Sequence, residues 1–220
     1  MAVFEKPGGR WPPWMEKQLV RRGIVDTRVL EAMRQVPREA FVPKNLRHLA
    51  YDDGPLPIGC GQTLSQPYIV ALSLQALALT GQETVLDVGT GSGYQAVLLS
   101  YLAAEVHTVE IQHPLLMSAR LVIEQYAQAP VHMHLGDGSL GWPPHAPYQA
   151  IVVGARAPTL PPSLVAQLAP GGRLVIPIGG ESVQMLYRMT PKPDGTLEKS
   201  MLERVVFVPL LGKEGVGVIP

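Results

Sequence analysis

The sequence predicts a doubly wound α/β fold whose mostly parallel sheet ends in an antiparallel hairpin. Three observations support this prediction. From residue 85 onward, short apolar runs alternate with segments of helical periodicity, as expected for parallel strands whose two faces are covered by helices. The last two apolar runs are separated only by a turn signal, Pro193-Asp194-Gly195. A glycine-rich turn follows the first run, where such folds bind ligands.

The part of the chain before residue 81 is predicted to be a helical extension followed by a loop. Apolar residues recur at helical spacing up to Pro37, which closes the first helix. The stretch 51–65 is rich in Gly, Pro and Asp, so we expect a loop with one short strand pair. A strong helix, 68–79, follows Pro67 and ends at a Thr-Gly pair.

The second part of the chain is predicted to alternate between strands and helices. Strands are expected at 85–88, 106–109, 131–135, 150–153, 173–177, 184–189 and 205–211. Helices are expected at 94–102 and 114–126. A third helix is expected where Leu160, Leu164 and Leu168 lie four residues apart, and it should end at Pro170-Gly171-Gly172.

Composition limits the classes of function. The 220 residues are 46% hydrophobic, enough for one packed domain. Lys plus Arg equals Asp plus Glu at 18 each, so we expect no nucleic-acid partner. The single cysteine, Cys60, excludes an intramolecular disulfide and a zinc–thiolate cluster. Residues 1–14 lack the apolar core of a signal peptide, and no run of 18 apolar residues occurs. We therefore expect a cytoplasmic monomer without a membrane segment.

The glycine turn Asp87 to Gly93 predicts a cofactor site. Glycine lets a ligand approach the backbone, and the following helix offers unpaired N–H groups. The spacing is G-x-G-x-G, which differs from the dinucleotide-binding fingerprint. Glu110 lies 23 residues after Asp87, at the end of the next apolar run, where an acid can bind ribose hydroxyls. Together these features favour an adenosine-type cofactor, and S-adenosylmethionine fits better than NAD.

Several motifs resemble those of the protein-L-isoaspartate (D-aspartate) O-methyltransferase family. The resemblance runs from about Met15 to Gly212. It rests on Gly59-x-Gly61-Gln62-Thr63-Leu64-Ser65-Gln66-Pro67, the glycine turn, Gly136-Asp137-Gly138, Leu168-x-Pro170-Gly171-Gly172-Arg173-Leu174 and Phe207-Val208-Pro209-Leu210. It implies a Rossmann-like methyltransferase fold, in which residues 1–80 form the extension and a covering loop and residues 81–220 bind the cofactor. The two parts are expected to form one compact unit.

The resemblance implies a repair enzyme (EC 2.1.1.77). The family transfers a methyl group from S-adenosylmethionine to the free carboxylate of L-isoaspartyl and D-aspartyl residues in damaged proteins, and S-adenosylhomocysteine is the product. Such a carboxylate is already ionised at neutral pH, so no strong general base is needed. By resemblance, Ser65 is the catalytic residue that hydrogen-bonds the carboxylate, and the Val208 backbone pairs with the substrate chain.

The resemblance also implies a set of cofactor-binding residues. Gly89 and Gly91 allow close backbone approach, Glu110 binds the ribose, and Asp137 and Gly138 lie by the adenine. The remaining members of the set are Gly59, Cys60, Gly61, Ser65, Asp87 and Leu211.

Each of these residues also has a plainer interpretation. Ser65 lies just before a helix that it could cap, Glu110 could be an ordinary surface acid, and Asp137 could only shape its turn. Cys60 is interpreted as a small buried or half-buried filler, not a nucleophile. His132 and His134 share a strand face, but no carboxylate or third histidine stands at ligand spacing, so no metal site is expected.

Arg156 departs from the family pattern, and its role is open. It follows the fourth strand of the α/β part, at the edge where ligands bind. Either it points to solvent, which we favour, or it adds a positive charge that attracts acidic peptides. Two other functions are also considered. A methyltransferase could act on a different carboxylate or small molecule, whereas a non-catalytic binding module would not need the intact glycine turn, Glu110 and Ser65.

Overall fold

A computed structural model describes residues 11–192 and 194–217. Residues 1–10 and Pro193, which belong to the N-terminal stretch and the turn considered above, lie outside this range. The helices are α1 (Pro13–Gln18), α2 (Thr27–Gln35), α3 (Pro67–Leu77), α4 (Tyr94–Ser100), α5 (His113–Tyr126) and α6 (Pro162–Ala166). The strands are β1 (Leu56–Gly59), β2 (Gln62–Leu64), β3 (Thr84–Val88), β4 (Glu105–Glu110), β5 (Val131–Leu135), β6 (Tyr148–Val153), β7 (Leu168–Gly179), β8 (Gln184–Pro191) and β9 (Leu197–Val205).

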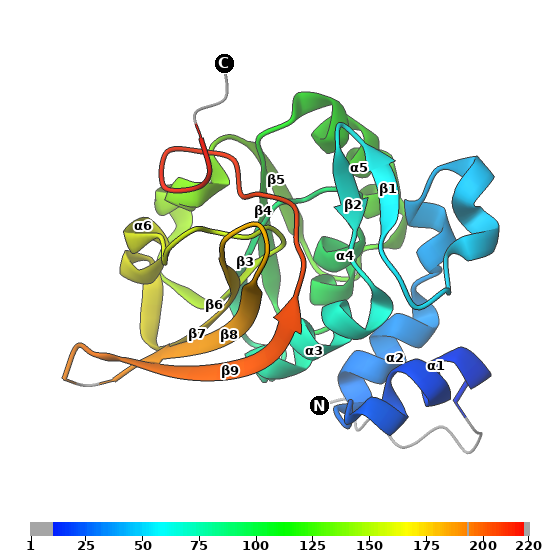
Figure 1. Ribbon diagram of the computed structural model, residues 1–220, viewed down its shortest axis with the longest axis horizontal. Coiled ribbons are helices and arrows are strands. Elements are labelled where there is room, and N and C mark those ends of the chain that lie inside the picture. The colour runs from blue at the N-terminus through cyan, green and yellow to red at the C-terminus, as the bar shows by residue number, and fades with distance from the viewer. Residues whose placement is uncertain (1–10, 193, 218–220) are drawn as a thin grey trace.

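Seven strands form one sheet in the order β5-β4-β3-β6-β7-β8-β9. Strands β3 to β7 pair in parallel, whereas β8 pairs antiparallel with both β7 and β9 (Figure 1). The order reverses at β3, because β4 lies on one side of it and β6 on the other. This confirms the predicted fold class and the hairpin that ends it.

The sheet is buried on both faces, which explains the continuous apolar runs of its central strands. Along β3, Val85 packs into one core with α1 to α5, whereas Leu86 and Val88 pack into a second core that contains Leu164 of α6. The N-terminal helices belong to the first core, so the described part of the extension packs directly against the α/β layers. None of the helices in the described residues has the length and hydrophobicity needed to span a bilayer.

The helix-capping chemistry agrees with the sequence in the extension. The Asp26 carboxylate accepts hydrogen bonds from the backbone N–H groups of Arg28 and Val29 and so begins α2. Helix α3 begins at Pro67 as predicted, and its C-cap, Ala78, adopts φ 49°. The expected short strand pair within 51–65 is confirmed as the antiparallel β1–β2 hairpin.

Two predicted elements were wrong. The helix expected through Leu168 covers only α6, and Pro170-Gly171-Gly172 lies inside β7, where the register with β6 shifts. The last strand was expected at 205–211, but β9 ends at Val205. It is an edge strand with a mostly exposed, polar surface, so it lacks the apolar run used to find strands. The apolar residues 206–211 instead continue as an extended segment past β6.

Candidate functional site

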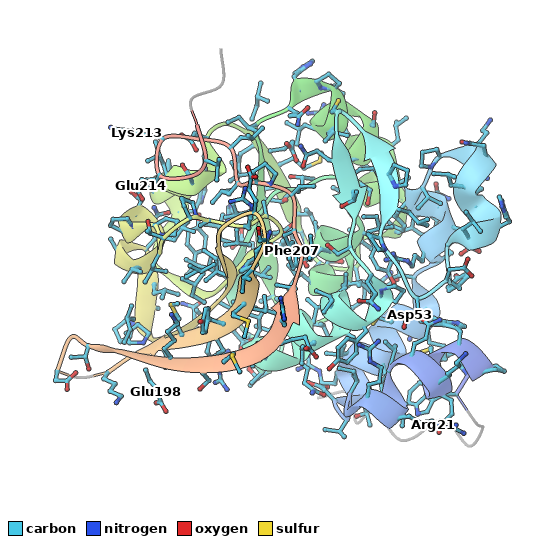
Figure 2. The ribbon with its side chains drawn as sticks, in the orientation of Figure 1. Arg21, Asp53, Glu198, Phe207, Lys213 and Glu214 are labelled. Carbon is cyan, nitrogen blue, oxygen red and sulfur yellow. The ribbon has the colours of Figure 1, made fainter. Side chains whose placement is uncertain are left out.

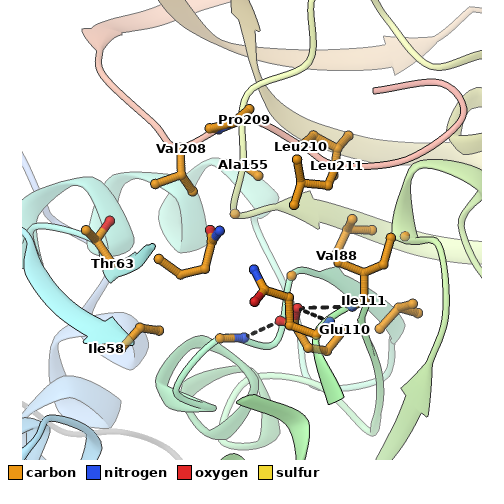
Figure 3. Close-up of a pocket in the computed structure, with 17 residues that line it drawn as sticks. Ile58, Thr63, Val88, Glu110, Ile111, Ala155, Val208, Pro209, Leu210 and Leu211 are labelled. Carbon is orange, nitrogen blue, oxygen red and sulfur yellow. Dashed lines mark hydrogen bonds between the residues drawn. The ribbon is translucent and has the colours of Figure 1, made fainter. Parts of the chain in front are cut away.

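A cavity lies at the carboxyl ends of β3, β4 and β6. This is the edge at which parallel α/β sheets bind ligands, next to the point where the strand order reverses. The cavity is covered by the β1–β2 hairpin on one side and by the segment after β9 on the other (Figure 3). Its lining includes six of the residues predicted from the sequence, namely Gly89, Gly91, Glu110, Gly138, Val208 and Leu211.

Glu110 is a buried carboxylate that holds the glycine turn. Its Oε2 atom accepts a hydrogen bond of 2.9 Å from the Gly91 N–H. Its Oε1 atom accepts from the N–H groups of Ile111 and Gln112, at 3.0 and 2.9 Å. These bonds use three of the roughly four acceptor positions of a carboxylate. The interpretation of Glu110 as a surface acid is therefore wrong, since the side chain is 6% exposed and organises the cavity wall (Figure 3).

The glycine turn leaves open space where a ligand can approach. Gly89 adopts φ 94°, and a Cβ atom added there would meet no protein atom within 4 Å. The backbone itself is fixed, because the Gly89 N–H donates to the Val109 carbonyl at 2.8 Å. Gly89 is therefore a rigid part of the wall with no side chain between backbone and cavity.

Two predicted residues lie behind the cavity wall and do not line it. Asp87 is fully buried and accepts hydrogen bonds from Gln95 Nε2 and Thr108 Oγ1, at 2.8 and 2.9 Å. Burial raises the pKa of Asp87 to about 7. Asp137 accepts from the Ser139 N–H and hydroxyl. It also accepts from the N–H of Lys213, a residue of the C-terminal loop (Figure 2). Its carboxylate therefore shapes the turn and ties that loop to it.

Ser65 lines a second cavity. Thr63 lines both cavities, so they lie side by side at the end of β2. Phe207 lines the second cavity and Val208 the first, so the chain after β9 passes from one to the other (Figure 2). The interpretation of Ser65 as a helix cap is wrong, because Gln66 is the N-cap of α3 and no side-chain cap bond is formed.

The tip of the β1–β2 hairpin does not line either cavity. Gly59, Cys60 and Gly61 are exposed and all have positive φ. The prediction that Cys60 is a buried or half-buried filler is wrong, since Cys60 is exposed at the tip of this turn. The hairpin is nevertheless held next to Glu110, because Gln112 Nε2 donates to the Cys60 carbonyl at 3.3 Å.

Arg156 is buried, so the prediction that it points to solvent is wrong. Its side chain is 9% exposed, and Nη1 donates to the Gly179 carbonyl at 3.4 Å. Its backbone N–H donates to the Val208 carbonyl and its carbonyl accepts from the Leu210 N–H, both at 2.8 Å. Arg156 thus holds the segment that closes the cavity against the sheet.

Sequence reasoning missed Arg38, which holds the backbone at Ser65. Arg38 is fully buried, and its Nη2 atom donates to the Ser65 carbonyl at 2.7 Å. Its Nε atom donates to the Ala50 carbonyl, also at 2.7 Å. A charged residue just after Pro37 has the sequence signal of an exposed loop, so only the tertiary contacts reveal this role.

Comparison with solved structures defines the class of protein. A structure from Plasmodium falciparum, described as a protein-L-isoaspartate O-methyltransferase in complex with S-adenosyl-L-homocysteine, matches with a TM-score of 0.77 and 31% identity. The match covers 90% of this chain and 96% of that one. The fold is therefore that of an α/β methyltransferase.

Sequence comparison defines the family. The family model "Protein-L-isoaspartate(D-aspartate) O-methyltransferase" matches residues 14–215. A protein-L-isoaspartate O-methyltransferase of Marinobacter nauticus is 54% identical over 90% of this chain and 91% of its own length. One of Trichlorobacter lovleyi is 50% identical over 91% of this chain and 93% of its own length. The chain belongs to the protein-L-isoaspartate O-methyltransferase family. The predicted activity (EC 2.1.1.77) and cofactor, which are those of this family, are thereby confirmed.

Proposed function

We propose that the two adjoining cavities hold the methyl donor and the damaged peptide, and that the Ser65 hydroxyl orients the attacking carboxylate. The observation that carries this proposal is the shared wall at Thr63. A methyl transfer needs the two reactants aligned at about 3 Å, so donor and acceptor sites must meet. The cavity beside Glu110 takes the donor, and the cavity beside Ser65 takes the isoaspartyl residue.

The residues of the first cavity fit S-adenosylmethionine. Open space above the Gly89 backbone, the buried Glu110 carboxylate and the apolar side chains of Val88 and Leu210 suit a ligand with a hydroxyl-bearing sugar and a flat base. When bound, the cofactor supplies a methyl group already activated by its sulfonium. We propose that Glu110 binds a ribose hydroxyl with its remaining acceptor position and that Gly138 contacts the base.

The chemistry left to the protein is placement. The isoaspartyl carboxylate is ionised at neutral pH, because its pKa is about 4. A neutral hydroxyl such as Ser65 can donate a hydrogen bond to one carboxylate oxygen while the other remains free to attack. A cation in the same position would withdraw charge from the attacking oxygen. The side chain of Phe207 and the segment around Val208 help to exclude water from the reacting atoms.

The substrate backbone is proposed to pair with Val208. The Val208 carbonyl is already occupied by the Arg156 N–H, whereas its own N–H donates to no group among the described residues. That N–H is therefore the group available to a peptide in extended conformation. We also propose that D-aspartyl residues are accepted, and that the chain acts as a cytoplasmic monomer divided at about residue 80 into extension and cofactor-binding domain. These remain predictions from the sequence and the family.

The test compares two peptides that differ only in Asp and isoAsp, with methyl-labelled S-adenosylmethionine. Base-labile label is expected on the isoAsp peptide alone. The variant Ser65→Ala should lower kcat/KM by about 10- to 150-fold, the equivalent of one hydrogen bond to a charged group. Its affinity for S-adenosylhomocysteine should remain within about twofold of wild type.

The matched control is Ser200→Ala, which removes an exposed hydroxyl on β9. It should leave both turnover and cofactor affinity unchanged. Label on neither peptide would refute the proposed acceptor. Full turnover by Ser65→Ala would instead refute only the role of Ser65. Methyl transfer to a third peptide, which contains D-aspartate, tests whether D-aspartyl residues are also substrates.

A further inference from the structure

Five titratable side chains gather at the β5 edge of the sheet, and we call them the histidine cluster: Glu105, His107, His132, His134 and His145. Glu105 and His107 belong to β4 and His132 and His134 to β5, whereas His145 stacks on His107 with ring centroids 4.2 Å apart. His107 of β4 and His132 of β5 are register partners in parallel strands, so their side chains emerge on the same face. The expectation of no metal site considered only spacing within β5. Strand pairing brings a carboxylate and a third histidine from β4, so that reasoning was wrong.

Three ligand-type atoms of the cluster converge. Glu105 Oε1 lies 2.8 Å from His132 Nε2 and 3.6 Å from His107 Nε2, and the three atoms lie within 4.8 Å of one another. A separation of 3.6 Å is too long for a hydrogen bond. His107 is only 1% exposed, yet its Nε2 atom has no hydrogen-bond partner among the described residues. A buried polar atom without a partner is costly in free energy, so this atom calls for a ligand.

The other nitrogen of His107 is held in the manner of a metal ligand. His107 Nδ1 lies 3.0 Å from His134 Nε2. If Nδ1–H donates to His134, the lone pair of His107 Nε2 points toward Glu105 and His132, and metal-binding histidines characteristically donate their second N–H in this way.

We propose that Glu105, His107 and His132 form a binding site for Zn²⁺ or a chemically similar divalent transition-metal ion. Two imidazole nitrogens and one carboxylate oxygen are a zinc-type donor set, whereas Mg²⁺ and Ca²⁺ prefer oxygen alone. Tetrahedral zinc with bonds of about 2.0–2.1 Å places its ligand atoms about 3.4 Å apart. To reach that separation, Glu105 Oε1 and His132 Nε2 must move apart from 2.8 Å, while both adjust toward the buried His107. The side chains of Glu105 and His132 are 40% and 46% exposed, so they have room for this rearrangement.

The position of the site defines its role and makes it independent of catalysis. None of its three ligands lines either of the two cavities described above. A bound ion would join β4 to the edge strand β5, which leads directly into Gly138 of the cofactor cavity. The ion would therefore act as a structural clamp on the sheet edge, and its binding can be measured without any methyl-transfer assay.

The test uses untagged full-length protein freed of metal by a chelator. Isothermal titration with Zn²⁺ should show one ion per chain with micromolar or tighter affinity, and Mg²⁺ should not compete. His132→Asn and Glu105→Gln change exposed side chains, so both variants should fold, and each should weaken Zn²⁺ binding by at least about tenfold. His48→Gln, which alters an exposed histidine elsewhere, is the matched control and should bind as wild type does.

A second readout separates specific binding from general histidine affinity. At one fixed Zn²⁺ concentration, the Tm of the wild type and of His48→Gln should rise by the same amount, and that of His132→Asn should rise less, because the stabilisation depends on the affinity of the folded state for the ligand. Equal Zn²⁺ affinity in wild type and His132→Asn would overturn the proposal. So would a loss of affinity in His48→Gln as large as that in Glu105→Gln.

Discussion

Replacing Arg38 by methionine should destabilise the protein, because it removes the donor that two buried carbonyls share. The guanidinium donates to Ala50 O and Ser65 O at 2.7 Å each, and its carbon lies 5.1 Å from the centre of the Tyr94 ring. Burial lowers the pKa of Arg38, because removing the guanidinium from water disfavours its charged form. Methionine keeps most of the volume but supplies no N–H group.

The magnitude follows from these contacts. A hydrogen bond to a charged group contributes about 1.5–3 kcal/mol, so the two together contribute about 3–6 kcal/mol. Removing the buried charge recovers part of its desolvation cost. We therefore expect Arg38→Met to lower the free energy of unfolding by about 2–5 kcal/mol, a large share of the roughly 5–15 kcal/mol typical of a domain. Arg38→Lys keeps the charge but loses the forked geometry, so its effect should be intermediate.

Urea unfolding measures this effect as a lower midpoint with an unchanged m-value. The control is Arg34→Met, which removes an exposed pair with Glu31 and should cost at most about 1 kcal/mol. In Arg38→Lys, kcat/KM should fall more than the affinity for S-adenosylhomocysteine, because the backbone at Ser65 is no longer held. A loss below about 1 kcal/mol in Arg38→Met, or one equal to that of Arg34→Met, would refute the reasoning.

Three further predictions concern Glu110 and the glycine turn. Glu110→Gln should weaken S-adenosylhomocysteine binding at least about tenfold, because three backbone N–H groups lose the carboxylate that accepts their hydrogen bonds. A calorimetric titration measures the affinity, and an unchanged value would contradict this expectation. The folded protein holds the Asp87 proton up to about pH 7, whereas the unfolded chain releases it near the ordinary pKa of 3.8. Between these values the free energy of unfolding should fall with rising pH, by up to about 1.4 kcal/mol per unit relative to Asp87→Asn. Denaturation of wild type and Asp87→Asn at several pH values measures this. If their free energies of unfolding changed with pH in parallel, the Asp87 effect would be excluded. Gly93→Ala should lower the free energy of unfolding by about 2–5 kcal/mol, because φ is 85° and the new Cβ would lie 2.8 Å from Ile123 Cγ1. A thermal melting curve like that of wild type would disprove this clash.

The sequence by itself determined the elements whose chemistry is local. Strands β3 to β6 were located within two residues, because strands buried on both faces are continuously apolar. The glycine turn and Glu110 were found for a similar reason, since positive φ favours glycine and the acid is the last residue of its strand. The same reasoning failed at β9, where an exposed edge strand is polar and the apolar stretch beyond it covers a cavity.

Only the tertiary structure decided the contacts between residues far apart in the chain. Arg38 reaches the backbone of Ser65 across 27 positions, and Glu105 meets His132 only because β4 and β5 pair in parallel. Arg156 illustrates the physical reason. A charged side chain is predicted to be exposed from its own chemistry, yet Arg156 is buried where the Gly179 carbonyl accepts a hydrogen bond from its guanidinium. Gly179 ends β7, so the position of its carbonyl depends on strand pairing and packing rather than on the sequence next to Arg156.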